Sequence, residues 1–446
     1  MTETVLVRER ASRALGSLAV PATASRLIAI IAVVLIPLRV TLPHEVPISL
    51  VISVILAPLW VPAVARFRLM RLVLAGGLVT LASGFVLALA HQSTNGVDRT
   101  SLISYLLLLL NLITSIGVVL WARTVLDTRT VALVFGVGLV LGIVPLDSQF
   151  SENPWKFSFA FPVAVVALAL AQRFRSWWVE LLVLLVLLAY SATHDFRSMF
   201  GQMLLAAAIL AAQVPLKRFG RKGSAARIIV GLGVLAILVY NAGQALILDG
   251  ALGAATQARS IAQIDTSGSL IVGGRPELAA TLALMRQDPA GFGLGVNLTP
   301  DQLLTAKSGM ASIGYAPNNG YVENFMFGGH IELHSVVGDL WAHFGVVGFA
   351  YALLLAVVMV WFLAKNIAER HATGLMLFAV AQSLWFLPFG PLLSSRTSIV
   401  LAIGLVALPV VSATRDGATR HHRYVKEPEW PTTKPIDPGE SSPALP

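Results

Sequence analysis

The chain has 446 residues, of which 56% are hydrophobic and 12% are charged. Soluble globular proteins contain about 45–50% apolar and about 25% charged residues. This composition therefore excludes a soluble multidomain enzyme, a disordered protein and a fibrous protein. The chain has no cysteine, which excludes disulfides, thiol catalysis and cysteine-ligated metals. Lysine and arginine exceed aspartate and glutamate by 32 − 23 = 9, so the positions of these charges must be compared with a membrane topology.

Long apolar stretches recur along most of the chain. A membrane-spanning helix needs about 20 mostly apolar residues, and we predict an all-α polytopic membrane protein with about twelve such helices. The predicted spans are residues 27–43, 48–65, 70–91, 101–122, 129–146, 157–172, 177–193, 198–215, 226–248, 337–364, 372–390 and 396–413.

The basic residues indicate how these spans are oriented. If the N-terminus is cytoplasmic, 23 of the 32 lysines and arginines lie on its side of the membrane. The nine on the other side are Arg39, Arg99, Lys156, Arg197, Arg259, Arg275, Arg286, Lys307 and Arg396. Cytoplasmic loops of membrane proteins carry an excess of lysine and arginine. We therefore attribute the net charge of +9 to topology and expect no nucleic-acid partner.

This topology divides the chain into five regions. They are a cytoplasmic N-terminal tail (1–26), nine spans (27–248), a long outer loop (249–336), three more spans (337–413) and a disordered cytoplasmic tail (414–446). Loops longer than about 12–15 residues are usually functional or disordered. In the outer loop, Pro276 begins a predicted helix, Asp288-Pro289 ends it, and the segment Gly291-Phe-Gly-Leu-Gly295 predicts a turn.

Polar residues at the outer interface of so apolar a protein are candidates for function. The first group is His194-Asp195-Phe196-Arg197-Ser198, a short outer turn between the seventh and eighth spans. An ordinary polar turn, whose arginine reaches toward lipid headgroups, would have the same sequence. The second group is Gly273-Gly274-Arg275-Pro276-Glu277. Free N–H groups at the start of a helix, together with Arg275, favour an anion, although a solvated helix cap is the simpler alternative.

The third group lies between Glu332 and Gly345, where we predict that a helix enters the membrane from the outer side. It carries His334, Asp339 and His343. Nine residues separate the two histidines, which places them on opposite faces of a helix, so they are not expected to share a metal. His334 and Asp339, five residues apart, are also poorly aligned. A histidine that only packs at the interface is the alternative interpretation.

Together the three groups provide two guanidiniums, which match phosphate oxygens, and a histidine, which can exchange a proton near neutral pH. These groups suit binding of a diphosphate and removal of a proton from an acceptor. No nucleotide-binding glycine motif and no metal-binding motif occurs in the sequence. We therefore expect no metal and no cofactor.

The order of these motifs resembles the O-antigen ligase/polymerase superfamily of bacterial envelope glycosyltransferases. Asp195-Phe-Arg197-Ser198 before an apolar helix is similar to the family's Ser-Arg entry to a spanning helix. Gly274-Arg275, followed by Asp288-Pro-Ala-Gly-Phe-Gly-Leu-Gly295, is similar to its Gly-Arg…Pro-x-Gly-x-Gly-x-Gly stretch. The segment from His334 to Gly348 is similar to its His-Asn-x-x-Leu…Gly-x-x-Gly signature, except that Ser335 replaces the asparagine.

The resemblance implies a GT-C-like glycosyltransferase in the bacterial cytoplasmic membrane, with both termini cytoplasmic and the active site on the outer face. It would transfer a glycan, with inversion, from a polyprenyl-diphosphate carrier to a glycan or glycolipid acceptor. By the same resemblance, Arg197 and Arg275 would bind the diphosphate, and His334 would be the general base or orient the acceptor.

Four further residues of the same motifs have supporting roles in this interpretation. Glu332 and Asp339 are alternative bases if His334 only orients the acceptor. Asp195 and Ser198 flank the first arginine and could support it.

Three other functions fit parts of the sequence. A transporter or exporter of a lipid-linked glycan would place charges at the middle of the membrane and break its helices in two repeats. Here the polar residues within the spans are few (Asn111, Gln202, Asn241 and Gln382). A scaffold protein and an enzyme of the cell-wall elongation type are further alternatives. Ligase and polymerase differ in their acceptor, which the sequence does not identify.

Overall fold

The computed structural model describes residues 22–144, 148–218, 224–251, 253–270 and 275–410. The described residues up to Pro409 belong to one compact unit, which is built mostly of helices. All of the expected cytoplasmic tail 414–446 lies outside the described residues. Residues 22–26 were expected in the N-terminal tail, but they begin helix α2 (Ala22–Leu35).

Five helical segments of the described chain are long and apolar enough to cross a membrane. They are α5 (Met70–His91), α6 (Arg99–Val125), the segment Trp155–Phe174, α12 (Ala225–Leu248) and α17 (Val336–Ala368). Trp155–Phe174 consists of the π-helical turn η2 (Trp155–Phe159), α9 (Ala160–Ala171) and the 3-10 turn η3 (Gln172–Phe174). The shorter apolar helices are α2, α7 (Thr128–Leu141), α10 (Trp177–Thr193), α18 (Gly374–Phe389) and α19 (Leu392–Val406). A mostly helical protein with helices long and apolar enough to cross a membrane is thus confirmed, whereas the number twelve stays a prediction.

The second expected span, 48–65, is divided into two short helices. These are α3 (Ile48–Ile55) and α4 (Ala57–Val64), which meet at Leu56. Proline has no backbone N–H for the preceding turn, and α4 contains proline both in its first turn and at Pro62. Before α3, the strands β1 (Thr41–Leu42) and β2 (Val46–Pro47) form a small hairpin around the 3-10 turn η1 (Pro43–Glu45).

The long helices differ in how much of their surface the protein covers. In the most apolar window of α6, 61% of the residues are buried, whereas in that of α12 only 6% are buried. Apolar side chains such as Val230, Ile237 and Leu238 on α12 are exposed. Because exposed apolar surface of this size is unfavourable in water, α12 is best explained by contact with lipid.

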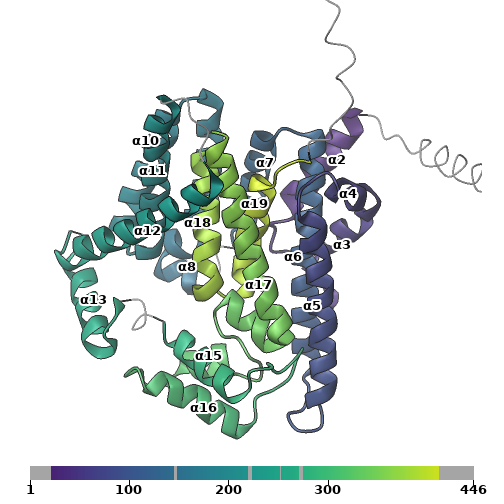
Figure 1. Ribbon diagram of the computed structural model, residues 1–446. Coiled ribbons are helices and arrows are strands. Elements are labelled where there is room, and N and C mark those ends of the chain that lie inside the picture. Colours follow the sequence, from purple (N-terminus) through teal and green to yellow (C-terminus); the bar gives the residue numbers. More distant parts are fainter. Residues whose placement is uncertain (1–21, 145–147, 219–223, 252, 271–274, 411–446) are drawn as a thin grey trace, which may run out of the picture. The chain divides into compact units, whose positions relative to one another are not determined.

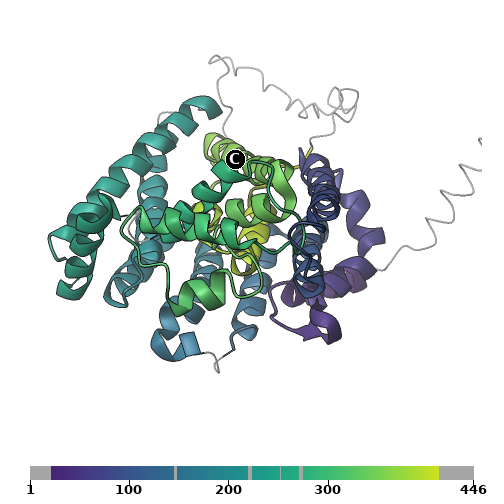
Figure 2. The same ribbon diagram turned by 90° about the horizontal axis from the view of Figure 1, so that it is seen from below.

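The helices between α12 and α17 gather at one end of the bundle, near the bottom of Figure 1. They are α13 (Ala254–Ser267), α15 (Pro276–Gln287), α16 (Pro300–Ala311) and the π-helical turn η4 (Tyr321–Met326). Figure 2, a view from below, shows the green helices of this segment in front of the yellow-green helices. We call this end of the bundle the loop end. The remaining helices of the described residues are the short α8 (Ser148–Glu152) and α11 (Arg197–Arg218).

The predicted helix from Pro276 and the glycine turn after it are both present. Helix α15 begins at Pro276 and ends before Asp288. In the turn that follows, Phe292 N and Gly293 N donate to the carbonyl oxygen of Ala342 on α17, at 2.9 and 3.0 Å. Gly293 has a φ of 114°, and a Cβ atom there would lie 2.4 Å from Ala88 N of α5. Only glycine fits this conformation and this close approach, so the turn fastens the loop to α5 and α17.

Candidate functional site

Four cationic side chains and one carboxylate lie close enough at the loop end to affect one another electrostatically. The cations are Lys156 on η2, Arg197 at the start of α11, Arg259 on α13 and Arg275 at the N-cap of α15. The carboxylate is that of Asp195, in the turn before α11. We call this group the cation cluster. Asp195 Oδ2 pairs with Arg259 Nη1 at 2.9 Å. One carboxylate against four cations leaves a net positive charge, which favours an anionic ligand.

Arg197 is held in place by helix α13. Its Nη1 donates to Ser260 Oγ at 2.8 Å and to Gln263 Oε1 at 3.2 Å. Burial lowers the pKa of Arg197, and the positive charges of Arg259 and Arg275 act in the same direction, while Asp195 acts against them. Among the described residues, Nε and Nη2 of Arg197 have no hydrogen-bond partner, so they are available to an anion.

Ser198 and Asp195 flank Arg197 as the sequence requires, but they have different surroundings. Ser198 lies in the first turn of α11, where its side chain makes no hydrogen bond to another described residue. Asp195 has a φ of 49° and pairs with Arg259 through one oxygen. Its other oxygen, Oδ1, is buried and has no partner among the described residues.

Arg275 is the N-cap residue of α15 and lies over an aromatic ring. Its guanidinium carbon is 5.7 Å from the centre of the Phe389 ring at the end of α18, a cation–π contact. Its backbone oxygen accepts from Leu278 N at 3.2 Å, whereas its side chain makes no hydrogen bond or ion pair with the rest of the described chain. The two glycines before it, at positions 273 and 274, lie outside the described residues, so the predicted backbone anion site is not described.

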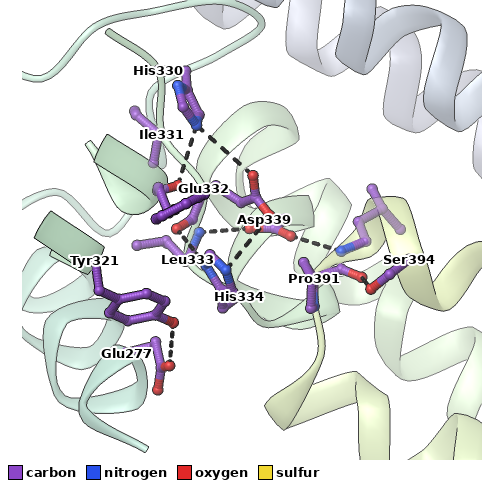
Figure 3. Close-up of polar contacts among 12 residues, drawn as sticks. Glu277, Tyr321, His330, Ile331, Glu332, Leu333, His334, Asp339, Pro391 and Ser394 are labelled. Carbon is purple, nitrogen blue, oxygen red and sulfur yellow. Dashed lines mark hydrogen bonds and ion pairs between the residues drawn. The ribbon is translucent and has the colours of Figure 1, made fainter. Parts of the chain in front are cut away.

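Tyr321 and Glu277 connect this region to His334. The Tyr321 hydroxyl donates to Glu277 Oε1 (Figure 3), and the Tyr321 ring lies edge-on to the His334 ring, with 5.2 Å between ring centres. Burial, followed by the charge and hydrogen bond of Glu277, raises the pKa of Tyr321, and Arg275 lowers it. Tyr321 therefore lies between the cation cluster and His334.

His334 is not on the helix that the sequence predicted for it. Its φ is 47°, in the left-handed region, and α17 begins only at Val336. Ser335 caps that helix by accepting from Gly338 N at 3.0 Å, and its hydroxyl donates to Leu387 O at 3.1 Å. The prediction that His334 and His343 occupy opposite faces of one helix is therefore wrong.

The carboxylate of Glu332 lies between two histidines (Figure 3). Its Oε1 is 3.8 Å from His334 Nε2, and its Oε2 is 3.8 Å from His330 Nε2. The Glu332 carboxylate, which accepts from the His330 imidazole, raises the pKa of His330, although burial opposes this. His334 Nδ1 faces the backbone oxygen of Glu332 at 3.3 Å. With its proton on Nδ1, His334 has an Nε2 lone pair that can accept a proton.

The Asp339 carboxylate is buried and hydrogen-bonded to the backbone. It is 1% exposed, its Oδ1 accepts from Leu333 N at 2.8 Å and its Oδ2 accepts from Leu392 N at 2.9 Å. Figure 3 shows these contacts, which tie the segment before α17 to the start of α19. Both oxygens are occupied, so Asp339 positions the segment that carries Glu332 and His334.

His343 is also part of the core. It is fully buried, stacks on Tyr105 with 3.4 Å between ring centres, and its Nε2 is 2.9 Å from Ile331 O. The Tyr105 hydroxyl donates to the same oxygen at 2.8 Å. These two side chains fix the backbone next to Glu332.

A cavity of about 360 Å³ opens on the other side of Glu332. It lies between α6 and the segment 328–332, and its polar side chains are those of Glu45, Asp98, Thr100, Ser101, Ser104, Tyr105, His330, Glu332 and Asp339. Within the described ranges, no group of three His, Cys, Asp or Glu residues is arranged to hold a metal ion.

Comparison with family models, with curated proteins and with solved structures found no match to this chain. The functional argument therefore rests on the arrangement of the side chains. Sequence reasoning missed Lys156 and Arg259 in the cation cluster, although both belong to the nine cations expected on the outer side. It also missed Tyr321 and Glu45, for which no local motif gave a signal.

Proposed function

We propose that this protein is a membrane glycosyltransferase. It would move a glycan from a polyprenyl-diphosphate carrier to a glycan or glycolipid acceptor on the outer face of the bacterial cytoplasmic membrane. The proposal includes about twelve spans, a GT-C-like fold, cytoplasmic termini and an outer loop end, as in the O-antigen ligase/polymerase superfamily that the motifs resemble. The observation that carries it is the cation cluster, which is linked to His334 through Arg275 and the Tyr321 ring.

The cation cluster suits the donor. A lipid diphosphate presents anionic oxygens at the membrane surface, and guanidiniums bind such oxygens through two parallel hydrogen bonds. Arg197 has free N–H groups for this purpose, and Arg275 has no anionic partner in the described chain. As the glycan leaves, negative charge grows on the diphosphate, and preorganised cations stabilise that charge.

The proton step is assigned to His334 and Glu332. The acceptor oxygen would form a bond to the anomeric carbon while the bond from that carbon to the diphosphate oxygen breaks. The electrons of the broken bond leave with the polyprenyl diphosphate, and the hydroxyl proton passes to Nε2 of His334. Attack opposite the leaving group inverts the anomeric centre. Glu332, 3.8 Å from the same nitrogen, stabilises the resulting positive charge.

The deciding experiment separates donor binding from transfer in the His334→Ala variant. Binding of a polyprenyl-diphosphate glycan to purified protein should stay near the wild-type value, because the cation cluster is intact. Transfer should fall by about 10²–10⁴-fold, the usual contribution of a positioned base. The control is His371→Ala, since His371 has a 70% exposed side chain and lies beyond α17.

Two outcomes would contradict the proposal. Transfer by His334→Ala at the wild-type rate would remove His334 from the reaction. Movement of the intact lipid-linked glycan across vesicles by the wild-type protein, without transfer to any acceptor, would instead establish an exporter.

A further inference from the structure

We propose that the cavity beside Glu332 binds the acceptor and selects a neutral, hydroxyl-rich sugar unit over an anionic one. This inference rests on the glycosyltransferase function proposed above. The cavity volume of about 360 Å³ is near the lower limit of the range of about 300–1,000 Å³ that is common for small-molecule sites. The site therefore takes the terminal part of an acceptor, while the remainder extends toward solvent or lipid.

The Ser101 side chain indicates a polar ligand. Ser101 lines the cavity and is only 8% exposed, yet its hydroxyl has no hydrogen-bond partner in the described part of the chain. Its backbone N–H is already bonded to Asp98 Oδ2 at 2.6 Å. Buried polar groups normally have a partner, and a sugar hydroxyl would supply one. Ser104, one turn further along α6, donates to Glu45 Oε2 at 2.7 Å.

Glu45 reaches the cavity from a strained turn. It has a φ of 59°, a left-handed conformation that costs a non-glycine residue about 1–3 kcal/mol. The turn between β1 and β2 maintains this conformation, and the result is a carboxylate placed against α6. A residue held in this way is typical of a binding site, and it gives the cavity a further hydrogen-bond acceptor.

The charge of the cavity decides which sugars fit. The three accessible carboxylates of its lining are those of Glu45, Asp98 and Glu332, and His330 is the one side chain of the lining that can carry positive charge. Asp339 also lines it, but this residue is 1% exposed and both its oxygens already accept backbone N–H groups. A uronic acid or another anionic sugar would be repelled, whereas neutral hydroxyl groups can donate hydrogen bonds to these oxygens. The cation cluster is linked to His334 through Arg275 and Tyr321, whereas this cavity is lined by His330 and Glu332, and the two have opposite charges.

Glu332 connects the cavity to the reaction. Its Oε2 is oriented toward His330 in the cavity lining, and its Oε1 is oriented toward His334. An acceptor hydroxyl at this edge of the cavity would meet the residues that take up its proton. The position of the cavity therefore matches the nucleophile, as the position of the cation cluster matches the leaving group.

A labelling experiment tests the cavity without any assay of transfer. The wild-type chain has no cysteine, so Ser104→Cys places a single thiol in the cavity and Ser312→Cys places a control thiol on the exposed end of α16. Each variant reacts with a cationic (trimethylammonioethyl) and an anionic (sulfonatoethyl) methanethiosulfonate. The ratio of the cationic to the anionic labelling rate should be about tenfold higher at position 104 than at position 312. The carboxylates of the cavity attract the cationic reagent and repel the anionic one. Equal ratios would overturn the charge selection.

Protection by sugars tests the ligand class. Neutral trisaccharides (maltotriose, cellotriose and mannotriose) should slow labelling at position 104 and leave position 312 unchanged, while trigalacturonate should protect neither. Protection by trigalacturonate, by Ca²⁺ alone, or by none of the neutral sugars would refute the proposal.

The transfer assay then distinguishes the two proposals. Ser101→Ala should raise the acceptor concentration for half-maximal transfer about tenfold, the cost of one hydrogen bond of about 1.4 kcal/mol, and leave that of the donor unchanged. Ser312→Ala, which removes an exposed hydroxyl outside the cavity lining, is the matched control. If the wild-type protein transfers glycan and Ser101→Ala leaves the acceptor concentration for half-maximal transfer unchanged, the acceptor site is refuted and the proposed reaction is not. Sugar protection in a protein that transfers nothing would refute the proposed reaction and leave the sugar site in place.

Discussion

Asp339 and Glu332 are carboxylates of the same segment, and the structure predicts opposite consequences when each is converted to its amide. Asp339 accepts two backbone N–H groups, at 2.8 and 2.9 Å, and is 1% exposed. In Asp339→Asn one oxygen can keep one bond, but the amide nitrogen faces the other N–H. An unsatisfied buried donor costs about 1–3 kcal/mol. The free energy of unfolding should therefore fall by about 1–3 kcal/mol.

Glu332→Gln should behave in the opposite way. The Glu332 side chain is 24% exposed, and its carboxylate contacts two histidines at 3.8 Å rather than backbone N–H groups. The unfolding free energy should stay within about 0.5 kcal/mol of wild type, while transfer falls by about 10²–10⁴-fold. Denaturant titration in detergent micelles, followed by tryptophan fluorescence, measures the first quantity, and transfer from a lipid-diphosphate glycan measures the second. Asp301→Asn, on the exposed first turn of α16, is the matched control for the amide substitution.

The reasoning fails if the two phenotypes are exchanged. An Asp339→Asn protein with unchanged unfolding free energy and no transfer would make Asp339 a group that acts on the substrate. A Glu332→Gln protein that unfolds more easily and still transfers would assign the positioning role to Glu332.

Four further predictions follow from the same structure. Arg197→Lys loses the two-point contact and should weaken donor-lipid binding about a hundredfold, or about 3 kcal/mol, in a competition assay; a change below threefold would contradict it. Glu332 raises the pKa of His330 in the native state. The resulting stabilisation is complete below the pKa of the unfolded state, about 6.5, and is lost as pH rises through the native pKa. Unfolding midpoints measured across pH should lose this dependence in Glu332→Gln. In intact cells, an impermeant maleimide should label Ser312→Cys and not Ser224→Cys, and the reverse would invert the topology. Transfer should continue in excess chelator, and loss of activity that Mg²⁺ restores would refute the metal-independent reaction.

Features that depend on local patterns could be predicted from the sequence. Helix α12 ends at Leu248, as expected, and α17 begins at Val336, one residue before the expected span. The start of α15 at Pro276 follows from the fixed φ of proline and its missing N–H. The turn at Gly291–Gly295 follows from the freedom of glycine at positive φ. Each of these signals lies within a few residues of the feature it predicts.

The conformation at His334 was missed because a helix start was placed too early. Serine before an apolar run is a helix-capping signal, and Ser335 does cap α17 through Gly338 N. Extending the helix back to His334 gave a helical-face argument that does not apply. The Tyr321–Glu277 and Ser104–Glu45 contacts span 44 and 59 residues, and no local pattern reports contacts of that separation.

The arrangement of charge around Glu332 bears on the choice between transfer and export. An exporter moves one anionic headgroup along a path, and a path benefits from charge of one sign at membrane depth. Here a net positive cluster lies on the Arg275 side of His334, and a cavity lined by three accessible carboxylates lies on the His330 side. A carboxylate-lined cavity would repel a diphosphate that continued past His334. The same cavity accommodates a neutral nucleophile that must meet the anomeric carbon while the diphosphate stays behind. Opposite charges on the two sides of the proposed base therefore favour a reaction between two substrates over the passage of one.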